Sequence, residues 1–270
     1  MKIALGQIDC EPGRIAANTD KLCGHVHQAA GQDCDVVVFP EMADTGYDPA
    51  ILATASVGWQ TGPLPALQKA AAEAGITVVC GLSERTAGAI YNALAVISPS
   101  GELAGRYRKA HLITPAPFAE DRCFAPGHDL LLTQIGGWRW GFTICYDIRF
   151  PELYRRLALA GATVLVNCAA FPLSRAMNWD VLTRARAIEN QAFLLAANRV
   201  GTDGPCQFGG RSRVVAPDGT LVADAPADAE TLLTASFDPR QVDAVRREIP
   251  VFEARRPDIY GDLNAPGKVY

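Results

Sequence analysis

The chain has no long apolar run. None of its uninterrupted apolar stretches approaches the roughly 20 residues that a membrane-spanning helix needs, and residues 1–9 turn polar too soon to form the core of a signal peptide. An excess of basic residues is missing as well, since 25 Lys and Arg stand against 29 Asp and Glu. We therefore expect a cytoplasmic protein with neither a membrane nor a nucleic acid as its partner.

Cysteine pairs and catalytic histidine settings are also missing. The eight cysteines contain no CxxC spacing, which argues against a disulfide framework and against structural zinc, so we expect no metal site. None of the four histidines lies in a GxSxG or another recognised nucleophile setting. A Cys/His pair that uses His111 is the weaker alternative to chemistry without histidine.

Strand and helix patterns alternate along most of the 270 residues, 49% of which are hydrophobic, enough for a full core. Turn signals at 98–101 and 217–219 add antiparallel hairpins. We expect one α/β domain over 1–270, with an irregular tail from about 250, in which helices cover one mixed sheet or two packed sheets. Strands are expected at 2–8, 35–39, 76–81, 92–97, 102–108, 138–144, 163–167, 192–198, 214–216, 220–222 and 231–237, and helices at 15–29, 64–74, 151–160, 179–190 and 240–247.

Three strand-like runs end on residues that are suited to catalysis: Glu41, Lys109 and Cys145. Because the carboxyl ends of strands in α/β layers converge on one crevice, these three side chains could meet. A free thiol, with a pKa of about 8.5, needs a base or a positive charge to act as a nucleophile at neutral pH. Glu41 could supply the base, and Lys109 could stabilise the negative charge that develops when sulfur attacks a carbonyl or nitrile carbon.

Each of these residues also has a structural explanation. A cysteine at the end of an apolar strand is commonly inert core, Glu41 could be a turn acid, and Lys109 could be a solvated cation beside Arg106 and Arg108. The local sequences around the three residues decide between these interpretations.

Those local sequences are FPE followed by TGY (39–41 and 45–47), GRYRKAHL (105–112) and ICYDIRFPE (144–152). They resemble, in order, the glutamate, lysine and cysteine motifs of the nitrilase superfamily, the carbon-nitrogen hydrolases, and the chain is most similar to the amidase-type branch. The similarity covers nearly all of residues 2–238. It implies a four-layer α-β-β-α sandwich with mixed sheets, hydrolysis through a thioester without a cofactor, and protomers that pair across a helical face into a homodimer or a higher homo-oligomer.

The resemblance also implies roles for individual residues. Cys145 corresponds to the nucleophile and Glu41 to the general base. Lys109 corresponds to the group that stabilises the tetrahedral intermediate, together with the backbone N–H of Tyr146. A second family glutamate matches Glu120 best, with Asp121 as the rival.

Arg149 lies four residues after the nucleophile, where a guanidinium could bind a substrate carboxylate through two hydrogen bonds. Omega-amidases and N-carbamoyl amino acid hydrolases resemble this arrangement. The alternative is that Arg149 pairs with a structural acid, Asp147 or Glu152. Pro172 departs from the small hydroxyl residue that omega-amidases tend to have, which weakens the case for a dicarboxylate monoamide.

Three aromatic residues, Tyr47, Phe171 and Trp179, are candidates for the wall of the substrate pocket, and each could equally be core. The function expected is hydrolysis of a small linear amide with release of ammonia. An N-carbamoyl amino acid hydrolase or a nitrilase would use the same thiol chemistry. Hypotheses of other kinds are a Schiff-base enzyme that uses Lys109 and a catalytically inactive binding or assembly homologue.

Overall fold

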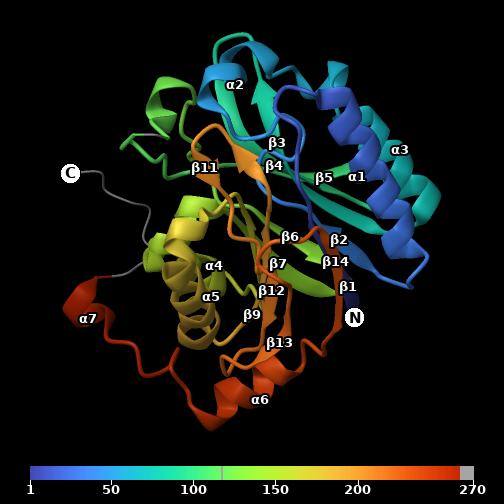
Figure 1. Cartoon of the computed structure of the whole chain (residues 1–270). Coiled ribbons are helices and arrows are strands. Elements are labelled where there is room, and N and C mark those ends of the chain that lie inside the picture. Colours follow the sequence, from blue (N-terminus) through green and yellow to red (C-terminus); the bar gives the residue numbers. More distant parts are fainter. Residues whose placement is uncertain (117, 262–270) are drawn as a thin grey trace.

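The computed structural model describes residues 1–116 and 118–261 of the chain (Figure 1). The last nine residues of the tail expected from about 250 lie outside this range. No helix of the described residues is long and apolar enough to cross a membrane.

The first sheet has three parallel strands at its centre and antiparallel strands on both sides. The strands β1, β2 and β3 are parallel, as βα connections require. The order across the sheet is β14 (Thr231–Ser236), β1 (Lys2–Gln7), β2 (Val36–Val38), β3 (Thr77–Arg85), β4 (Ile90–Ile97) and β5 (Leu103–Arg108).

The second sheet repeats this arrangement, with β7, β8 and β9 parallel and antiparallel neighbours outside them. Its order is β13 (Leu221–Asp224), β12 (Arg213–Val215), β9 (Phe193–Asn198), β8 (Val164–Ala169), β7 (Trp138–Ile144) and β6 (Leu132–Ile135). A separate short hairpin consists of β10 (Thr202–Asp203) and β11 (Cys206–Gln207).

The two sheets pack face to face, with β1 against β9 and β3 against β8. The side-chain alternation of a strand explains how one segment serves two layers. Val36 and Val38 of β2 belong to the core between the sheets, whereas Val37 packs in the outer core with Leu22 and Leu67. Those two leucines lie on α1 (Ile15–Ala30) and α3 (Leu64–Ala74), which cover the first sheet.

The outer face of the second sheet is covered by α4 (Pro151–Leu159) and α5 (Ala176–Asn190). Gly141 of β7 lies directly beneath Leu157 of α4, and Thr143 Oγ1 lies 2.6 Å from Tyr154 Oη of the same helix. Figure 1 shows the two helical layers on opposite sides of the strands. The expected α-β-β-α sandwich is confirmed.

Most expected elements are present, with differences at their ends. The strand expected at 76–81 continues to Arg85, because its pairing with β4 extends through Ile90. The helix expected from 179 begins at Ala176. Several further elements were not expected from the pattern, since each is short and without a clear period; they include α2 (Pro49–Ala55), β6, and the two strands of the β10–β11 hairpin. Beyond α6 (Gln241–Glu248), the tail contains α7 (Pro257–Tyr260).

Candidate active site

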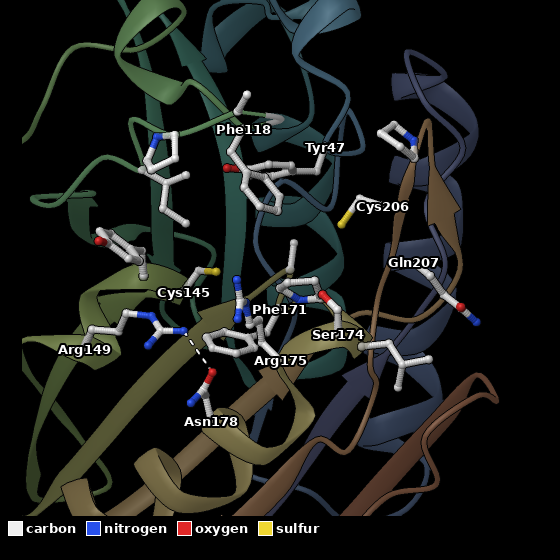
Figure 2. A pocket seen from close by; sticks show the side chains of 18 residues that line it. Tyr47, Phe118, Cys145, Arg149, Phe171, Ser174, Arg175, Asn178, Cys206 and Gln207 are labelled. Carbon is white, nitrogen blue, oxygen red and sulfur yellow. Dashed lines mark hydrogen bonds between the residues drawn. The ribbon is translucent and has the colours of Figure 1, made fainter.

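Cys145 lies in a sharp turn at the carboxyl end of β7. The strand passes directly into the 3-10 helix η3 (Cys145–Arg149), and Cys145 has a φ of +44°. Non-glycine residues adopt this left-handed conformation rarely, and such backbone strain is concentrated at functional sites. The turn presents the thiol to a cavity while only 6% of the residue is exposed (Figure 2).

Glu41 follows β2 and is completely buried. Its Oε1 accepts hydrogen bonds from Lys109 Nζ at 2.8 Å and Asn92 Nδ2 at 2.6 Å, and its Oε2 accepts one from the N–H of Ala170 at 2.8 Å. The loop that carries Glu41 packs so closely on β3 that a Cβ on Gly81 would lie 2.3 Å from the Pro40 carbonyl oxygen. The position of the carboxylate is therefore fixed by donors from both sheets.

Lys109 follows β5 and is 1% exposed. Its ammonium lies 2.8 Å from Glu41 Oε1 and 2.7 Å from Glu120 Oε1. Burial acts to lower the pKa of Lys109, but the negative charges of Glu120 and Glu41 outweigh it and hold this pKa well above its ordinary value. Lys109 therefore carries a positive charge at the centre of a buried cluster that it forms with Glu41 and Glu120.

Glu120 begins the 3-10 helix η2 (Glu120–Arg122) and is 1% exposed, whereas its sequence neighbour Asp121 is exposed. Besides Lys109, its Oε1 accepts hydrogen bonds from Tyr47 Oη at 2.5 Å and Asn92 Nδ2 at 3.2 Å. Its Oε2 accepts a hydrogen bond from the Ile113 N–H at 2.7 Å. Of the two acids considered, Glu120 is the one in the cluster.

The protonation of Cys145 follows from this environment. Burial raises the pKa of the thiol, the charge of Glu41 and a hydrogen bond to that carboxylate raise it further, and Lys109 lowers it by less. The pKa therefore lies well above its usual range, and the resting group is a thiol. A nucleophilic sulfur requires transfer of this proton at the moment of attack, and Glu41 is the adjacent acceptor.

The cavity in front of Cys145 has a volume of about 850 Å³ and is lined by both polar and apolar groups. Tyr47, Arg149 and Phe171 are among the lining residues (Figure 2), and so is Tyr146. Trp179 does not line the cavity. It is 1% exposed and lies behind Phe171, with the two ring centroids 5.2 Å apart, and its indole N–H donates to the Arg211 carbonyl oxygen.

Arg149 makes no salt bridge with any acid of residues 1–116 and 118–261. Its guanidinium carbon lies 6.0 Å and 5.7 Å from the ring centroids of Tyr146 and Phe171, and its one hydrogen bond, to Asn178 Oδ1, is long at 3.5 Å. Asp147, one of the two acids considered as its partner, accepts hydrogen bonds from other groups instead.

Asn92 of β4 is a site residue that the sequence analysis did not identify. It is 1% exposed, and one amide nitrogen donates to both Glu41 and Glu120. Its backbone carbonyl oxygen accepts a hydrogen bond from the backbone N–H of Lys109 at 2.8 Å. The available signal was an amide within the otherwise apolar strand 92–97, where a buried polar group needs partners.

A second residue that was not identified is Arg175, which also lines the cavity. It precedes α5, in a segment for which no helix or strand was expected. No group of three or more His, Cys, Asp or Glu in the described part of the chain is arranged to hold a metal ion. No disulfide joins any two of the eight cysteines.

Comparison with known proteins identifies close relatives of the whole chain. It is 36% identical over 270 residues to the protein named "Hydrolase in pqqF 5'region" of Pseudomonas protegens, covering 98% of this chain and 92% of that one. It is 33% identical to the 2-oxoglutaramate amidase of Bacillus subtilis, covering 94% and 97% of the two chains.

A solved structure with the same fold is a variant of the amidase from Nesterenkonia sp. AN1 that carries the acetamide moiety of fluoroacetamide bound covalently at its active site cysteine. It superposes with a TM-score of 0.84 and 26% identity, covering 96% of this chain and 95% of that one. The family model for carbon-nitrogen hydrolases matches residues 2–247. With the fold, the buried acid–lysine–cysteine cluster and these matches in agreement, the chain belongs to the carbon-nitrogen hydrolase family and is a C–N hydrolase enzyme.

Proposed function

We propose that this enzyme hydrolyses small linear amides that carry a carboxylate, through a thioester on Cys145, and releases ammonia. The observation that carries the proposal is the buried cluster of Glu41, Lys109 and Glu120 behind a cavity that holds both Cys145 and Arg149, an arginine that forms no salt bridge with any described acid. The cluster suits acyl transfer, and the arginine suits an anionic substrate.

In the first half of the reaction, Glu41 takes the proton of the Cys145 thiol as the sulfur attacks the amide carbon. The carbonyl π electrons move to oxygen, and the resulting oxyanion is stabilised by the Lys109 ammonium and the N–H of Tyr146. The C–N bond then breaks, and the departing nitrogen takes its proton from Glu41, so that ammonia leaves and a thioester remains.

In the second half, Glu41 accepts a proton from water as the water oxygen attacks the thioester carbon. Collapse of this second tetrahedral intermediate breaks the C–S bond and returns a proton to sulfur, giving the acid product and the free thiol. Glu120 contacts Lys109 and Tyr47 in the cluster. Its role is to hold the lysine in position while the charge on Glu41 changes through the cycle.

The carboxylate preference rests on Arg149, which approaches the cavity between the rings of Tyr146 and Phe171. The similarity to a 2-oxoglutaramate amidase points the same way. Hydrolysis of N-carbamoyl amino acids would place the same carboxylate on Arg149. Nitriles would share the first addition, but no contact in the site favours them over amides.

Ammonia release tests the proposal. The purified protein is incubated with succinamate, an N-carbamoyl amino acid, butyramide and a nitrile, beside the Cys145→Ala and Arg149→Ala variants. Turnover of succinamate that is abolished in Cys145→Ala, and for which Arg149→Ala raises KM about tenfold or more while butyramide turnover is little changed, is the expected result. Full activity of Cys145→Ala would eliminate the thioester mechanism, and an unchanged KM in Arg149→Ala would eliminate the carboxylate contact.

We also propose that two copies pair across α5. Three apolar residues on this helix are unusually exposed: Met177 at 79%, Val181 at 59% and Ile188 at 49%. Their spacing of four and seven residues places them on one face of the helix. Light scattering should give the mass of a dimer for the native chain and of a monomer for Val181→Glu, whereas a native monomer would contradict the pairing.

A further inference from the structure

Two arginines, Arg149 and Arg175, line the cavity that contains Cys145 (Figure 2). Arg149 ends η3, in the turn that follows β7, and Arg175 ends the 3-10 helix η4 (Leu173–Arg175), which leads into α5. In the described part of the chain, neither forms a salt bridge with a carboxylate. The cavity thus holds two positive charges, and the described protein supplies no counter-ion to either.

Two arginines that are almost completely buried in this protein are each paired with two acids. Arg199 contacts Asp203 and Asp9, and Arg213 contacts Asp180 and Asp224. These pairs follow the general rule that a cation withdrawn from water keeps an anion beside it. Arg155 and Arg246 are partly buried without an acid, but both donate to backbone carbonyl oxygens. Arg149 is partly buried too, and among the described residues its guanidinium has only the long hydrogen bond to Asn178, so it is available to an anion in the cavity.

No aspartate or glutamate belongs to the described residues that line the cavity. The acids behind it, Glu41 and Glu120, both contact Lys109. Asn178, in the first turn of α5, also lines the cavity, and no acidic residue occupies that turn. The positive end of a 15-residue helix therefore adds to the field of the two guanidinium groups.

We propose that the enzyme selects amides with two anionic groups, with Arg149 binding one carboxylate beside the rings of Tyr146 and Phe171 and Arg175 binding the second at the mouth of the cavity. This inference rests on the proposed function and defines its substrate class further. A substrate with a single carboxylate satisfies Arg149 alone and leaves the charge of Arg175 unused. Arg175 is exposed, so its contribution falls as salt is added.

The test uses three amides that differ by one carboxylate each: butyramide, succinamate and 2-(carbamoylmethyl)malonate. Their kcat/KM values are measured by ammonia release for the native enzyme, Arg175→Ala and Arg247→Ala. Arg247 is an exposed arginine on α6 that does not line the cavity, so its variant has the same net charge as Arg175→Ala.

We expect the native enzyme and Arg247→Ala to prefer the malonate derivative over succinamate by about fivefold, and Arg175→Ala to lose most of this preference. Raising the NaCl concentration should reduce the preference in the native enzyme. The proposal is overturned if the native enzyme shows no preference for the doubly charged amide, or if Arg247→Ala loses that preference to the same extent as Arg175→Ala.

A binding measurement separates this proposal from the proposed function. Calorimetric titration of Cys145→Ala with the same two anionic amides should show tighter binding of the malonate derivative, and the double variant with Arg175→Ala should remove the difference. If this preference is found but the native enzyme releases no ammonia from any amide, the anion site stands and the proposed function fails. If succinamate is hydrolysed but binding is equal, only the role of Arg175 fails.

Discussion

His111 Nδ1 lies 2.8 Å from Asp147 Oδ1, which joins the segment that carries Lys109 to the turn that carries Cys145. The same carboxylate accepts hydrogen bonds from the N–H of Ile144 and of His111 and from the hydroxyl of Tyr107. One buried side chain therefore sets the position of Cys145 relative to Lys109, although it does not line the cavity.

Asp147→Asn should impair both stability and turnover, because an amide oxygen cannot accept all four hydrogen bonds and the new NH₂ group faces donors. We expect the free energy of unfolding to fall by about 1–3 kcal/mol, and kcat to fall with little change in KM. Urea unfolding and ammonia release measure the two effects. Tyr107→Phe removes a single donor and serves as the milder control. A native kcat in Asp147→Asn would show that the turn carrying Cys145 keeps its position without the Asp147 carboxylate.

Asn92→Ala removes the amide that donates to both carboxylates of the cluster. Glu41 and Glu120 then keep Lys109 as their shared donor but lose the restraint on their relative position. We expect kcat to fall by at least about tenfold, since one well-placed charge-assisted hydrogen bond contributes about 1.5–3 kcal/mol. Asn178→Ala, at the cavity wall, should instead act mainly on KM. A native kcat in Asn92→Ala would show that turnover does not depend on Asn92.

Lys109→Met should destabilise the protein strongly, because it leaves two buried carboxylates without their cation. The expected loss is about 3–5 kcal/mol of unfolding free energy, together with loss of activity. Adding Glu120→Gln should recover part of the stability by removing one of those charges, while the double variant stays inactive because the oxyanion lacks its ammonium. A double variant no more stable than Lys109→Met would mean that charge repulsion is not the cause.

Asp44 should make stability depend on pH. Burial raises its pKa from 3.8 to about 6, although Ser83 donates two hydrogen bonds to it. Because the pKa is higher in the folded state, protonation of Asp44 stabilises the fold, and this contribution is fully present below about pH 4 and is lost as the pH rises through 6.

Asp44→Asn keeps the shape but cannot titrate. The difference in unfolding free energy between the native chain and this variant should therefore shift by about 2 kcal/mol in favour of the variant from pH 4.5 to pH 7.5. Urea titrations at the two pH values measure it. A constant difference would show that the pKa of Asp44 is not raised.

The strands that precede Glu41, Lys109 and Cys145 were the most predictable part of this chain. The run 138–144 was expected with the bounds that β7 has, because buried parallel strands are nearly continuous apolar runs bounded by turn residues. Asn92 and Arg175 could not be found in the same way. The role of Asn92 depends on which way β4 faces, and that of Arg175 depends on where the η4 turn lies against the second sheet, so both are set by tertiary contacts.

Trp179, in contrast, was identified from the sequence as a candidate for the pocket wall but does not line the cavity. The sequence shows that a large aromatic residue lies near the site. Whether its ring faces the cavity or supports the wall behind it depends on where α5 begins, and this helix begins three residues earlier than expected. The rotation of that helix places the indole beneath Phe171 and leaves Arg175 at the mouth of the cavity.

Glu41 and Lys109 come from one sheet, and Cys145 comes from the other. Glu41 and Lys109 follow β2 and β5, whereas Cys145 follows β7, and the N–H of Ala170 after β8 holds Glu41 across the gap. A sliding of the sheets by a fraction of a strand spacing would separate the proton acceptor from the sulfur before any helix melts. Turnover therefore depends on how the two sheets are packed against each other. When the protein is heated or placed under pressure, turnover should be lost before the circular dichroism signal of the helices.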